Sequence, residues 1–220
     1  MKRGADLWLW GSLAAFVLLS AAAGVRLLYA LDLWLLRVAQ SRPSRVLDAA
    51  GVLFSVPGEA EFAGAAMLVL AAGLFLTGRR ALAGSLLLAL VVTGLLEFAM
   101  KLWLPTVPVP PEAARSTDPS PILEIAYPYP YPSGHMLRAV ILFGAIYLLW
   151  PNHLLRAGIL LLLVGVTAGR VYLGVHWASD VVGGALLGVA GLAWAFGRPS
   201  AYKRRQATGI RHQQDQQPEI

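Results

Sequence analysis

The residues best suited to chemistry in this sequence are two histidines and a set of charged side chains at the edges of apolar stretches. His176 and Asp180 are four residues apart, so on one helix they would share a face and the carboxylate could reach the imidazole. A carboxylate that binds one ring nitrogen fixes the tautomer and leaves the other nitrogen as nucleophile or base. Because histidine titrates near neutral pH, His135 is a candidate proton donor to a leaving group.

A second set of residues could hold an anion. Lys101, Arg138 and Arg170 are cations near the ends of three different apolar stretches, and Ser133-Gly134 opens one of these stretches. Helix N-termini offer free N–H groups and a positive dipole end, which suit phosphate, and a glycine there lets the backbone approach a ligand closely. Cations, amides, a nucleophile and an acid together predict phosphoryl transfer, in which catalysis is mainly positioning and charge stabilisation.

The two imidazoles and the carboxylate could instead bind a metal ion. A metal cation would then lie among lysine and arginine side chains, and the two histidines belong to different apolar stretches. The chain contains no cysteine, which excludes thiolate metal sites, cysteine nucleophiles and disulfides. We therefore predict a site that works without metal, and we predict no cofactor.

The composition places this chemistry in a membrane protein. Apolar residues make up 57% of the 220 residues and charged residues 14%, whereas soluble domains have about 45–50% and about 25%. Mean hydropathy is +0.62. One small core cannot bury so much apolar surface, so a soluble domain is excluded, and the composition also excludes disorder. The net charge is +6, but the one run of three basic residues, Lys203-Arg204-Arg205, is too short for a nucleic-acid patch, and we predict no nucleic-acid partner.

Six apolar stretches are candidates for crossing a bilayer. They are Leu7–Val25, Phe62–Thr77, Ala81–Met100, Met136–Trp150, Leu154–Val171 and Trp177–Phe196. A spanning helix needs about 20 residues and must satisfy its own backbone groups in lipid. The second and fourth stretches are short, so we extend them outward through Glu59-Ala60-Glu61 and Ser133-Gly134-His135. The sequence thus predicts an all-α bundle of six transmembrane helices over residues 1–200, with a disordered tail over residues 201–220.

Basic residues set the predicted orientation. With a cytoplasmic N-terminus, ten of the 18 lysines and arginines lie inside, mainly in short turns such as Gly78-Arg79-Arg80 and in the tail. Both termini are then cytoplasmic, and the helix ends that carry the ionisable residues face outside. The chain start also resembles a secretory signal peptide that ends near Ser20-Ala21-Ala22-Ala23. Because the apolar run continues past these residues, we predict a retained span.

Two long segments connect the spans on the outer side. Between Tyr29 and Pro57, apolar residues recur at helical spacing, which predicts an amphipathic helix at the membrane interface. The segment Leu104–Pro132 is rich in proline and lacks a helical period, so we predict a loop that shapes an entrance. Glu97 lies four residues before Lys101, and we predict that the two side chains pair.

At these residues the sequence resembles the type 2 phosphatidic acid phosphatase superfamily of membrane lipid phosphatases, which carries three motifs. The second motif, P-S-G-H, is intact as Pro132-Ser133-Gly134-His135. The third, S-R-x5-H-x3-D, is present as Gly169-Arg170 followed by His176 and Asp180, with glycine in place of the leading serine. The resemblance covers the chain from about Leu31 to Phe196, including the order and spacing of the motifs.

The first motif of that family, K-x6-R-P, is degraded. Lys101 is present, but Pro108 and Val109 occupy the Arg-Pro positions. A phosphoryl transition state spreads negative charge over three oxygens, so another guanidinium should replace the missing one. Arg138 shares a helix face with His135, and we predict that it binds a phosphate oxygen bidentately. Arg115, in the outer loop, is the alternative.

The resemblance also implies roles and substrates. It implies that His176 attacks phosphorus and becomes a phosphohistidine, that Asp180 supports it, and that His135 protonates the leaving oxygen. The residues implied to hold the phosphate are Lys101, Ser133, Gly134 and Arg170. The implied partners are the bilayer and a lipid phosphate: undecaprenyl pyrophosphate or another polyprenyl phosphate, phosphatidic acid, or phosphatidylglycerol phosphate. A phosphotransferase that uses the same intermediate and a non-catalytic carrier or flippase stay open as alternatives, as does the oligomeric state.

Overall fold

The computed structural model describes residues 2–115 and 127–197, and within these ranges all regular structure is helical. The α-helices are α1 (Lys2–Gly24), α2 (Tyr29–Ala39), α3 (Arg45–Ser55), α4 (Ala60–Leu76), α5 (Arg80–Trp103), α6 (Gly134–Leu149), α7 (His153–Tyr172) and α8 (Ala178–Gly197). Two short 3₁₀ helices, η1 (Val56–Gly58) and η2 (Pro111–Ala113), lie in the connections. The predicted tail over residues 201–220 lies outside the described residues.

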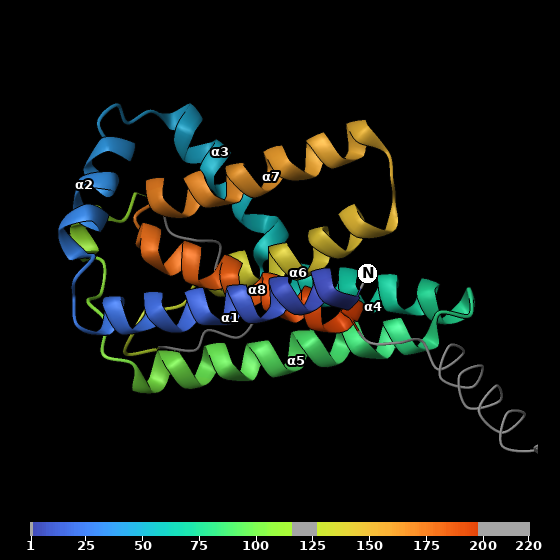
Figure 1. Ribbon diagram of the computed structural model, residues 1–220. Helices are drawn as coiled ribbons and strands as arrows, with labels where there is room; N and C mark the ends of the chain where they lie inside the picture. Colours follow the sequence, from blue (N-terminus) through green and yellow to red (C-terminus); the bar gives the residue numbers. More distant parts are fainter. Residues whose placement is uncertain (1, 116–126, 198–220) are drawn as a thin grey trace, which may run out of the picture.

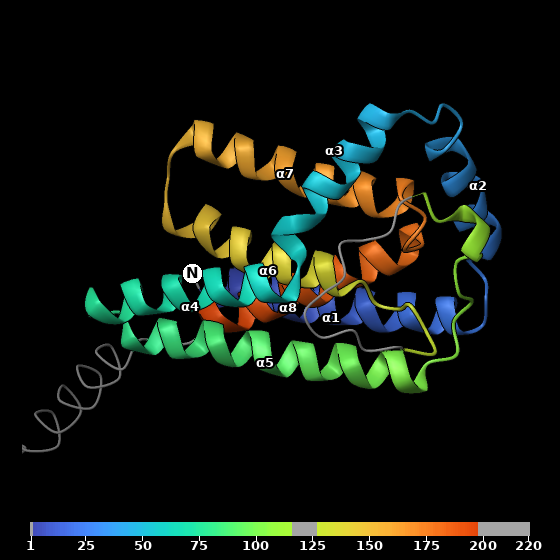
Figure 2. The same ribbon diagram turned by 180° about the vertical axis from the view of Figure 1, so that it is seen from behind.

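The centre of the bundle is α6, which packs against α4, α5, α7 and α8 (Figures 1 and 2). Its side chains Leu137, Ile141 and Leu142 are fully buried. The helix has only 16 residues, so at a rise of about 1.5 Å per residue it is shorter than the roughly 30 Å hydrocarbon layer. A central position explains how a short helix is tolerated, because neighbouring helices rather than lipid surround it.

Each of the six predicted apolar stretches is found as a helix. By length and composition, α5, α7, α8 and residues Gly4–Gly24 of α1 can cross a membrane. The helix α4 reaches that length only together with α3 and η1, from which it is bent by 44°. The helix α6 is shorter still. The all-helical membrane fold is therefore confirmed, while the count of six spans stays a prediction.

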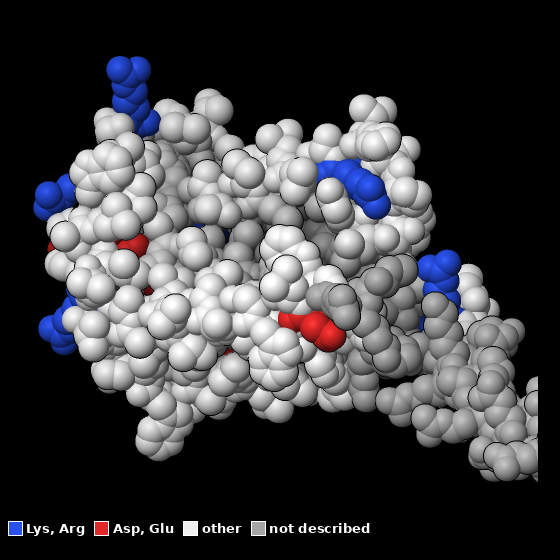
Figure 3. Space-filling model, in the orientation of Figure 1, with Lys and Arg blue, Asp and Glu red and all other residues white. Residues whose placement is uncertain are grey.

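The outside of the bundle is suited to lipid. Large apolar side chains such as Leu18 on α1, Leu95 on α5 and Leu161 on α7 are exposed. In Figure 3 the flank over α1 and α5 is almost free of charged residues, and lysine and arginine gather toward the two ends. A surface of this kind fits a hydrocarbon environment, with the basic residues near the headgroups.

The helix α1 packs along α8 and takes part in the core. The Phe16 ring stacks on the buried Tyr131 ring at a centroid distance of 6.1 Å, and the hydroxyls of Ser20 and Tyr131 are 2.9 Å apart. Burial raises the pKa of Tyr131 to about 12, so its hydroxyl stays protonated. Removal of α1 would expose these groups, and the packing thus supports the prediction that the first stretch is retained.

The segment between α1 and α4 forms α2 and α3, in agreement with the predicted helical content. On α2, the apolar side chains of Leu31, Trp34 and Val38 are exposed, whereas Asp32 and Leu36 are buried against the bundle. On α3, the Ser44 side chain caps the N-terminus by accepting from the Leu47 N–H at 3.2 Å. The exposed apolar face fits a membrane interface, although the interfacial location itself stays a prediction.

Candidate active site

Four helix ends meet at one end of the bundle and carry the predicted site residues. They are the C-termini of α5 and α7 and the N-termini of α6 and α8, which lie toward the left of Figure 1. The described ends of the chain lie away from them, at the other end of the bundle. A Cβ on Gly197 would lie 3.2 Å from the Cβ of Ala5 near the start of α1. Both described termini are therefore on the side opposite to the candidate site.

The predicted pair of His176 and Asp180 is formed. His176 Nδ1 lies 3.3 Å from Asp180 Oδ2, and the Trp177 backbone N–H donates to the same oxygen at 3.0 Å. The sequence predicted that both residues lie on one helix, but α8 begins at Ala178. His176 belongs to the preceding turn, and the contact forms because the Asp180 carboxylate folds back over the start of its helix.

The surroundings keep His176 in its neutral form. Burial lowers the pKa of His176 well below the 6.5 of an ordinary histidine, and the positive charges of Arg170 and Lys101 lower it further. With Nδ1 directed to the Asp180 carboxylate, the tautomer with its lone pair on Nε2 is favoured. Such an imidazole can act as a nucleophile at neutral pH.

The N-terminus of α6 is joined to that of α8 by a backbone bond, in which the Ser133 N–H donates to the Asp180 carbonyl at 2.9 Å. Ser133 Oγ and His135 Nε2 are buried, and neither has a hydrogen-bond partner among the described residues. Buried polar atoms are normally satisfied, so two orphaned groups beside a helix N-terminus are candidates for binding a ligand. The structure therefore brings Ser133, Gly134 and His135 together with the His176 pair.

The predicted pairing of Glu97 with Lys101 is confirmed. Lys101 Nζ lies 2.9 Å from Glu97 Oε1, and Lys101 also stands 4.7 Å from the centroid of the Tyr127 ring. Glu97 Oε2 in turn lies 3.4 Å from Arg138 Nη1. A Cβ on Gly134 would collide with the Glu97 carboxylate. The glycine thus allows this buried ion cluster to reach the start of α6.

Both candidates for the missing motif arginine have protein partners. Arg138 Nε donates to the Gly58 carbonyl at 2.9 Å, and with the Glu97 contact this uses two of the five guanidinium N–H groups. Arg115 Nε donates to Asp48 Oδ1 at 2.8 Å and to the Tyr172 hydroxyl at 3.1 Å. Arg138 therefore belongs to the α6 start, whereas Arg115 ties the loop after α5 to α3 and α7.

The glycine that replaces the leading serine of the third motif has a packing reason. A Cβ on Gly169 would lie 3.1 Å from the Gly51 carbonyl, so α7 and α3 approach closely at this point. One turn further along α3, the fully buried Ser55 hydroxyl accepts from Arg170 Nη1 at 3.1 Å. A hydroxyl from α3 thus reaches the arginine next to the altered position, a contact that the sequence did not indicate.

A cavity of about 340 Å³ opens onto Lys101 and His176. Its walls include Tyr127 and Tyr129 of the proline-rich segment that was predicted to shape an entrance. Pro108 and Val109, which stand at the Arg-Pro positions of the degraded motif, also line it, whereas the described lining residues include neither Arg138 nor Arg115. A phosphate in this cavity would meet an apolar wall where the motif places a guanidinium.

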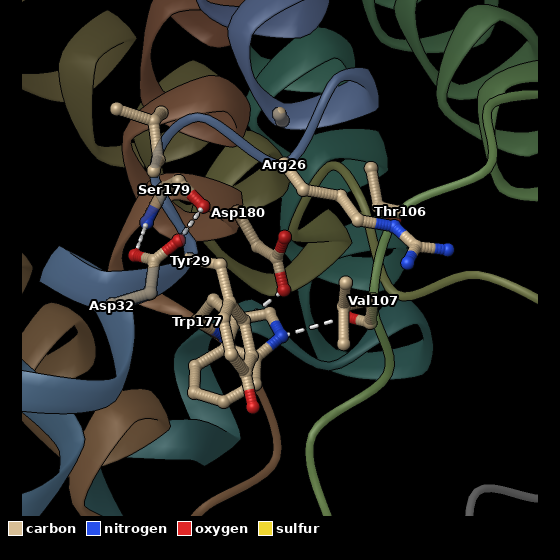
Figure 4. A pocket seen from close by; sticks show the side chains of 10 residues that line it. Arg26, Tyr29, Asp32, Thr106, Val107, Trp177, Ser179 and Asp180 are labelled. Carbon is tan, nitrogen blue, oxygen red and sulfur yellow. Dashed lines mark hydrogen bonds between the residues drawn. The ribbon is translucent and has the colours of Figure 1, made fainter.

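Sequence reasoning missed two residues that hold the turn containing His176 and Trp177, before α8. The Trp177 indole N–H donates to the Val107 carbonyl at 2.7 Å, which fixes the loop after α5 against this turn. Asp32, on α2, is buried and binds Ser179 at the start of α8 (Figure 4). Neither contact has a local sequence signal, because the partners are far apart in the chain.

Known proteins are similar to this chain in sequence and in fold. Phosphatidylglycerophosphatase B of Bacillus subtilis (strain 168) is 36% identical over 72 residues, 28% of this chain and 34% of that protein, so the match spans about a third of the relative. The fold is similar to the crystal structure of a transmembrane PAP2-type phosphatidylglycerolphosphate phosphatase from Bacillus subtilis, with a TM-score of 0.71, 21% identity, and coverage of 90% of this chain and 97% of that one. For Aquifex aeolicus LpxE the TM-score is 0.57, the identity 22%, and the coverage 76% and 96%.

The family itself follows from a longer match. The sequence model of the PAP2 superfamily matches residues 80–204, which is more than half of the chain and contains all three motif regions. Within that range the structure brings the His176–Asp180 pair, the α6 start and Lys101 to one end of the bundle. This chain belongs to the PAP2 superfamily.

Proposed function

We propose that this protein is an integral-membrane lipid phosphatase that hydrolyses a lipid phosphomonoester or pyrophosphate through a phosphohistidine, without metal, at the outer membrane face. The observation that carries the proposal is the buried pair of His176 and Asp180, of which His176 lines a cavity together with Lys101. A carrier would need cations to hold the lipid phosphate, but it would have no use for a neutral imidazole held by a carboxylate.

In the first half of the proposed reaction, His176 Nε2 attacks phosphorus and the bond from phosphorus to the lipid oxygen breaks. His135 supplies the proton that the departing oxygen takes up. Lys101, Arg170, the Ser133 hydroxyl and the N–H groups at the start of α6 surround the charge on the phosphoryl oxygens. Asp180 accepts a hydrogen bond from the Nδ1–H of His176 and stabilises the positive charge that the ring acquires.

In the second half, water attacks phosphorus and the bond from phosphorus to Nε2 breaks. His135, now without its proton, takes one from the attacking water, so each proton given in the first half is recovered in the second. This half releases inorganic phosphate and restores the neutral His176. The lipid product, released in the first half, is an alcohol, or a lipid monophosphate when the substrate is a pyrophosphate. If a lipid or sugar hydroxyl replaced water, the same intermediate would make the protein a phosphotransferase.

The substrate class follows from the membrane setting and the relatives. Candidate substrates are polyprenyl pyrophosphate such as undecaprenyl pyrophosphate, phosphatidic acid and phosphatidylglycerol phosphate, and the name of the Bacillus subtilis relative favours the last. The outer location is supported by the predicted positive-inside orientation and by both described termini lying opposite to the site. A lipid headgroup would then enter from the outer leaflet.

Activity should not require a metal ion. The site is rich in cations, and among the described residues no three of His, Cys, Asp and Glu are grouped to hold a metal. We expect purified protein in detergent to release phosphate from a panel of the candidate lipids at an unchanged rate after treatment with chelator. Orthovanadate should inhibit, because its five-coordinate form mimics displacement at phosphorus.

Loss of activity with chelator, restored by one divalent ion, would contradict the metal-free mechanism. Binding of lipid phosphate without any phosphate release would instead indicate a carrier. Appearance of a phosphorylated acceptor in place of free phosphate would indicate a transferase.

Arg138 should supply the guanidinium that the degraded motif lacks. Its Nε and Nη1 already bind protein groups, so the phosphate would use its remaining N–H groups. We expect Arg138→Ala to lose at least about tenfold in kcat/KM, roughly 1.4 kcal/mol, with Arg138→Lys recovering part of it. Steady-state kinetics on one lipid phosphate would measure this, with Arg115→Ala as the comparison. Near-normal kinetics in Arg138→Ala and a large loss in Arg115→Ala would assign the role to the loop.

A further inference from the structure

A carboxylate outside all three motifs binds the helix that carries Asp180. Asp32, on α2, has a relative exposure of 5%. Its Oδ1 accepts from the Ser179 backbone N–H at 2.9 Å, and its Oδ2 accepts from the Ser179 hydroxyl at 2.6 Å. Figure 4 shows Asp32 facing Ser179 from the neighbouring segment, with Trp177 and Asp180 beside it. Both oxygens of a buried carboxylate are thus committed to one residue.

The contact is a helix cap supplied by another helix. The first N–H groups of α8 have no partner within the helix, and a negative charge near them is stabilised by the helix dipole. Asp32 takes the N–H of Ser179, and Asp180 takes the N–H of Trp177. Two carboxylates therefore bind N–H groups two positions apart at the start of α8, one carboxylate from the helix itself and one from α2.

The first turn of α8 sets the position of the Asp180 carboxylate. Ser179 is the direct neighbour of Asp180, so a rotation of Ser179 would move the Asp180 carboxylate relative to His176. The Nδ1 to Oδ2 distance is 3.3 Å, and displacements well under 1 Å would break a bond of this length. Bidentate binding of Ser179 restricts such a rotation more than one hydrogen bond would.

We propose that Asp32 is a positioning residue for the reaction: by binding the Ser179 N–H and hydroxyl, it holds Asp180 on His176 Nδ1 and so keeps the Nε2 lone pair available. Asp32 would not touch the substrate. The expected effect on turnover rests on the proposed phosphatase function, but the effect on the His176 tautomer does not. The experiment can therefore contradict the phosphatase function and the role of Asp32 independently of each other.

The surroundings of Asp32 indicate that its removal would leave the fold intact. A cavity of about 20 Å³, which has room for one water molecule, lies among Asp32, Asp180 and Thr106. Thr106 Oγ1 is buried without a partner in the part of the chain that the structure describes. When alanine replaces Asp32, this polar cavity grows and water can reach the Ser179 N–H. A mobile water molecule then replaces the Asp32 carboxylate, and it satisfies the Ser179 N–H without fixing the turn.

The test compares Asp32→Ala, Asp32→Asn and Ser179→Ala in purified full-length protein. The chain has four histidines, so ¹⁵N labelling of histidine gives few ring signals, and a His176→Ala sample assigns those of His176. We expect wild type and Asp32→Asn to keep the Nδ1-protonated tautomer, because asparagine can accept from the N–H and donate to the hydroxyl. Asp32→Ala should show a mixture of tautomers, and Ser179→Ala, which keeps one of the two bonds, an intermediate result.

We expect kcat to fall in those variants in which the Nδ1-protonated tautomer of His176 is less populated. We expect Asp32→Ala to lose at least about tenfold in kcat with KM nearly unchanged, which is the lower end of what loss of a group that orients a functional side chain costs. Asp32→Asn should recover most of kcat. Asp6→Asn, which removes an exposed carboxylate from α1, is the matched control and should behave like wild type.

Wild-type tautomer and kcat in Asp32→Ala would overturn the proposal, whether or not the melting temperature falls. If Asp32→Ala does not fold, Ser179→Ala decides: an unchanged tautomer and kcat there would overturn the proposal, and an intermediate tautomer with reduced kcat would support it. If wild-type protein releases no phosphate from any lipid, the proposed function fails, and the tautomer measurement still decides the role of Asp32.

Discussion

Replacement of His176 by alanine should abolish turnover while leaving the fold and part of the lipid-phosphate binding intact. No other group among the described residues is a neutral imidazole held by a buried carboxylate, so nothing can replace the nucleophile. The phosphate-binding groups, including Lys101 and the Ser133 hydroxyl, are left in place. The measurement is phosphate release from the preferred lipid, together with quenching of a radiolabelled reaction to trap the acid-labile phosphohistidine.

The matched control for this variant is His153→Ala. His153 is exposed and begins α7 at the end of the bundle opposite to the site, so its loss should leave both turnover and the trapped intermediate at wild-type levels. Wild-type turnover in His176→Ala would refute the assignment of the nucleophile. Loss of turnover with an undiminished trapped phosphohistidine would place the phosphoryl group on another histidine.

The contacts within the candidate site could be predicted in part from the sequence, because local spacing carries the information. The predicted stretch Trp177–Phe196 and the observed helix Ala178–Gly197 differ by one residue at each end. Once the ends of the apolar helices are known, antiparallel packing must bring the ionisable residues at alternate ends together. The pairing of Glu97 with Lys101 follows from the same kind of local rule, because residues four apart on a helix are neighbours.

The supporting contacts could not be predicted because their partners are far apart. Asp32 and Ser179 are separated by 147 positions, and Ser55 and Arg170 by 115. Helical periodicity predicted an amphipathic helix that contains Asp32, but not which other helix the Asp32 side chain would meet. For Arg138, spacing indicated a shared face with His135 and gave no sign of its bonds to the α4–α5 side of the bundle.

Asp180→Asn should lower kcat by about four orders of magnitude, as the comparable change does in the serine-protease triad, or roughly 5.5 kcal/mol of barrier. Asp180 Oδ2 accepts from both the Trp177 N–H and His176 Nδ1. Asparagine can accept from the Trp177 N–H with its oxygen, so the turn should survive. Its amide then donates to Nδ1, which moves the ring proton to Nε2 and removes the attacking lone pair. Single-turnover kinetics in detergent would measure the loss.

The loss in Asp180→Asn should remain smaller than that in His176→Ala, because a minor tautomer still carries the lone pair on Nε2. Inorganic phosphate, which needs no bond to Nε2, should bind the asparagine variant nearly as tightly as wild type, since the groups that surround the phosphate are unchanged. Glu112→Gln, an exposed change on the outer loop, serves as the matched control for removing a carboxylate near the entrance. A kcat within about tenfold of wild type in Asp180→Asn, or 1.4 kcal/mol, would show that the carboxylate does not set the tautomer. Catalysis would then rest on burial of the imidazole and the surrounding cations alone.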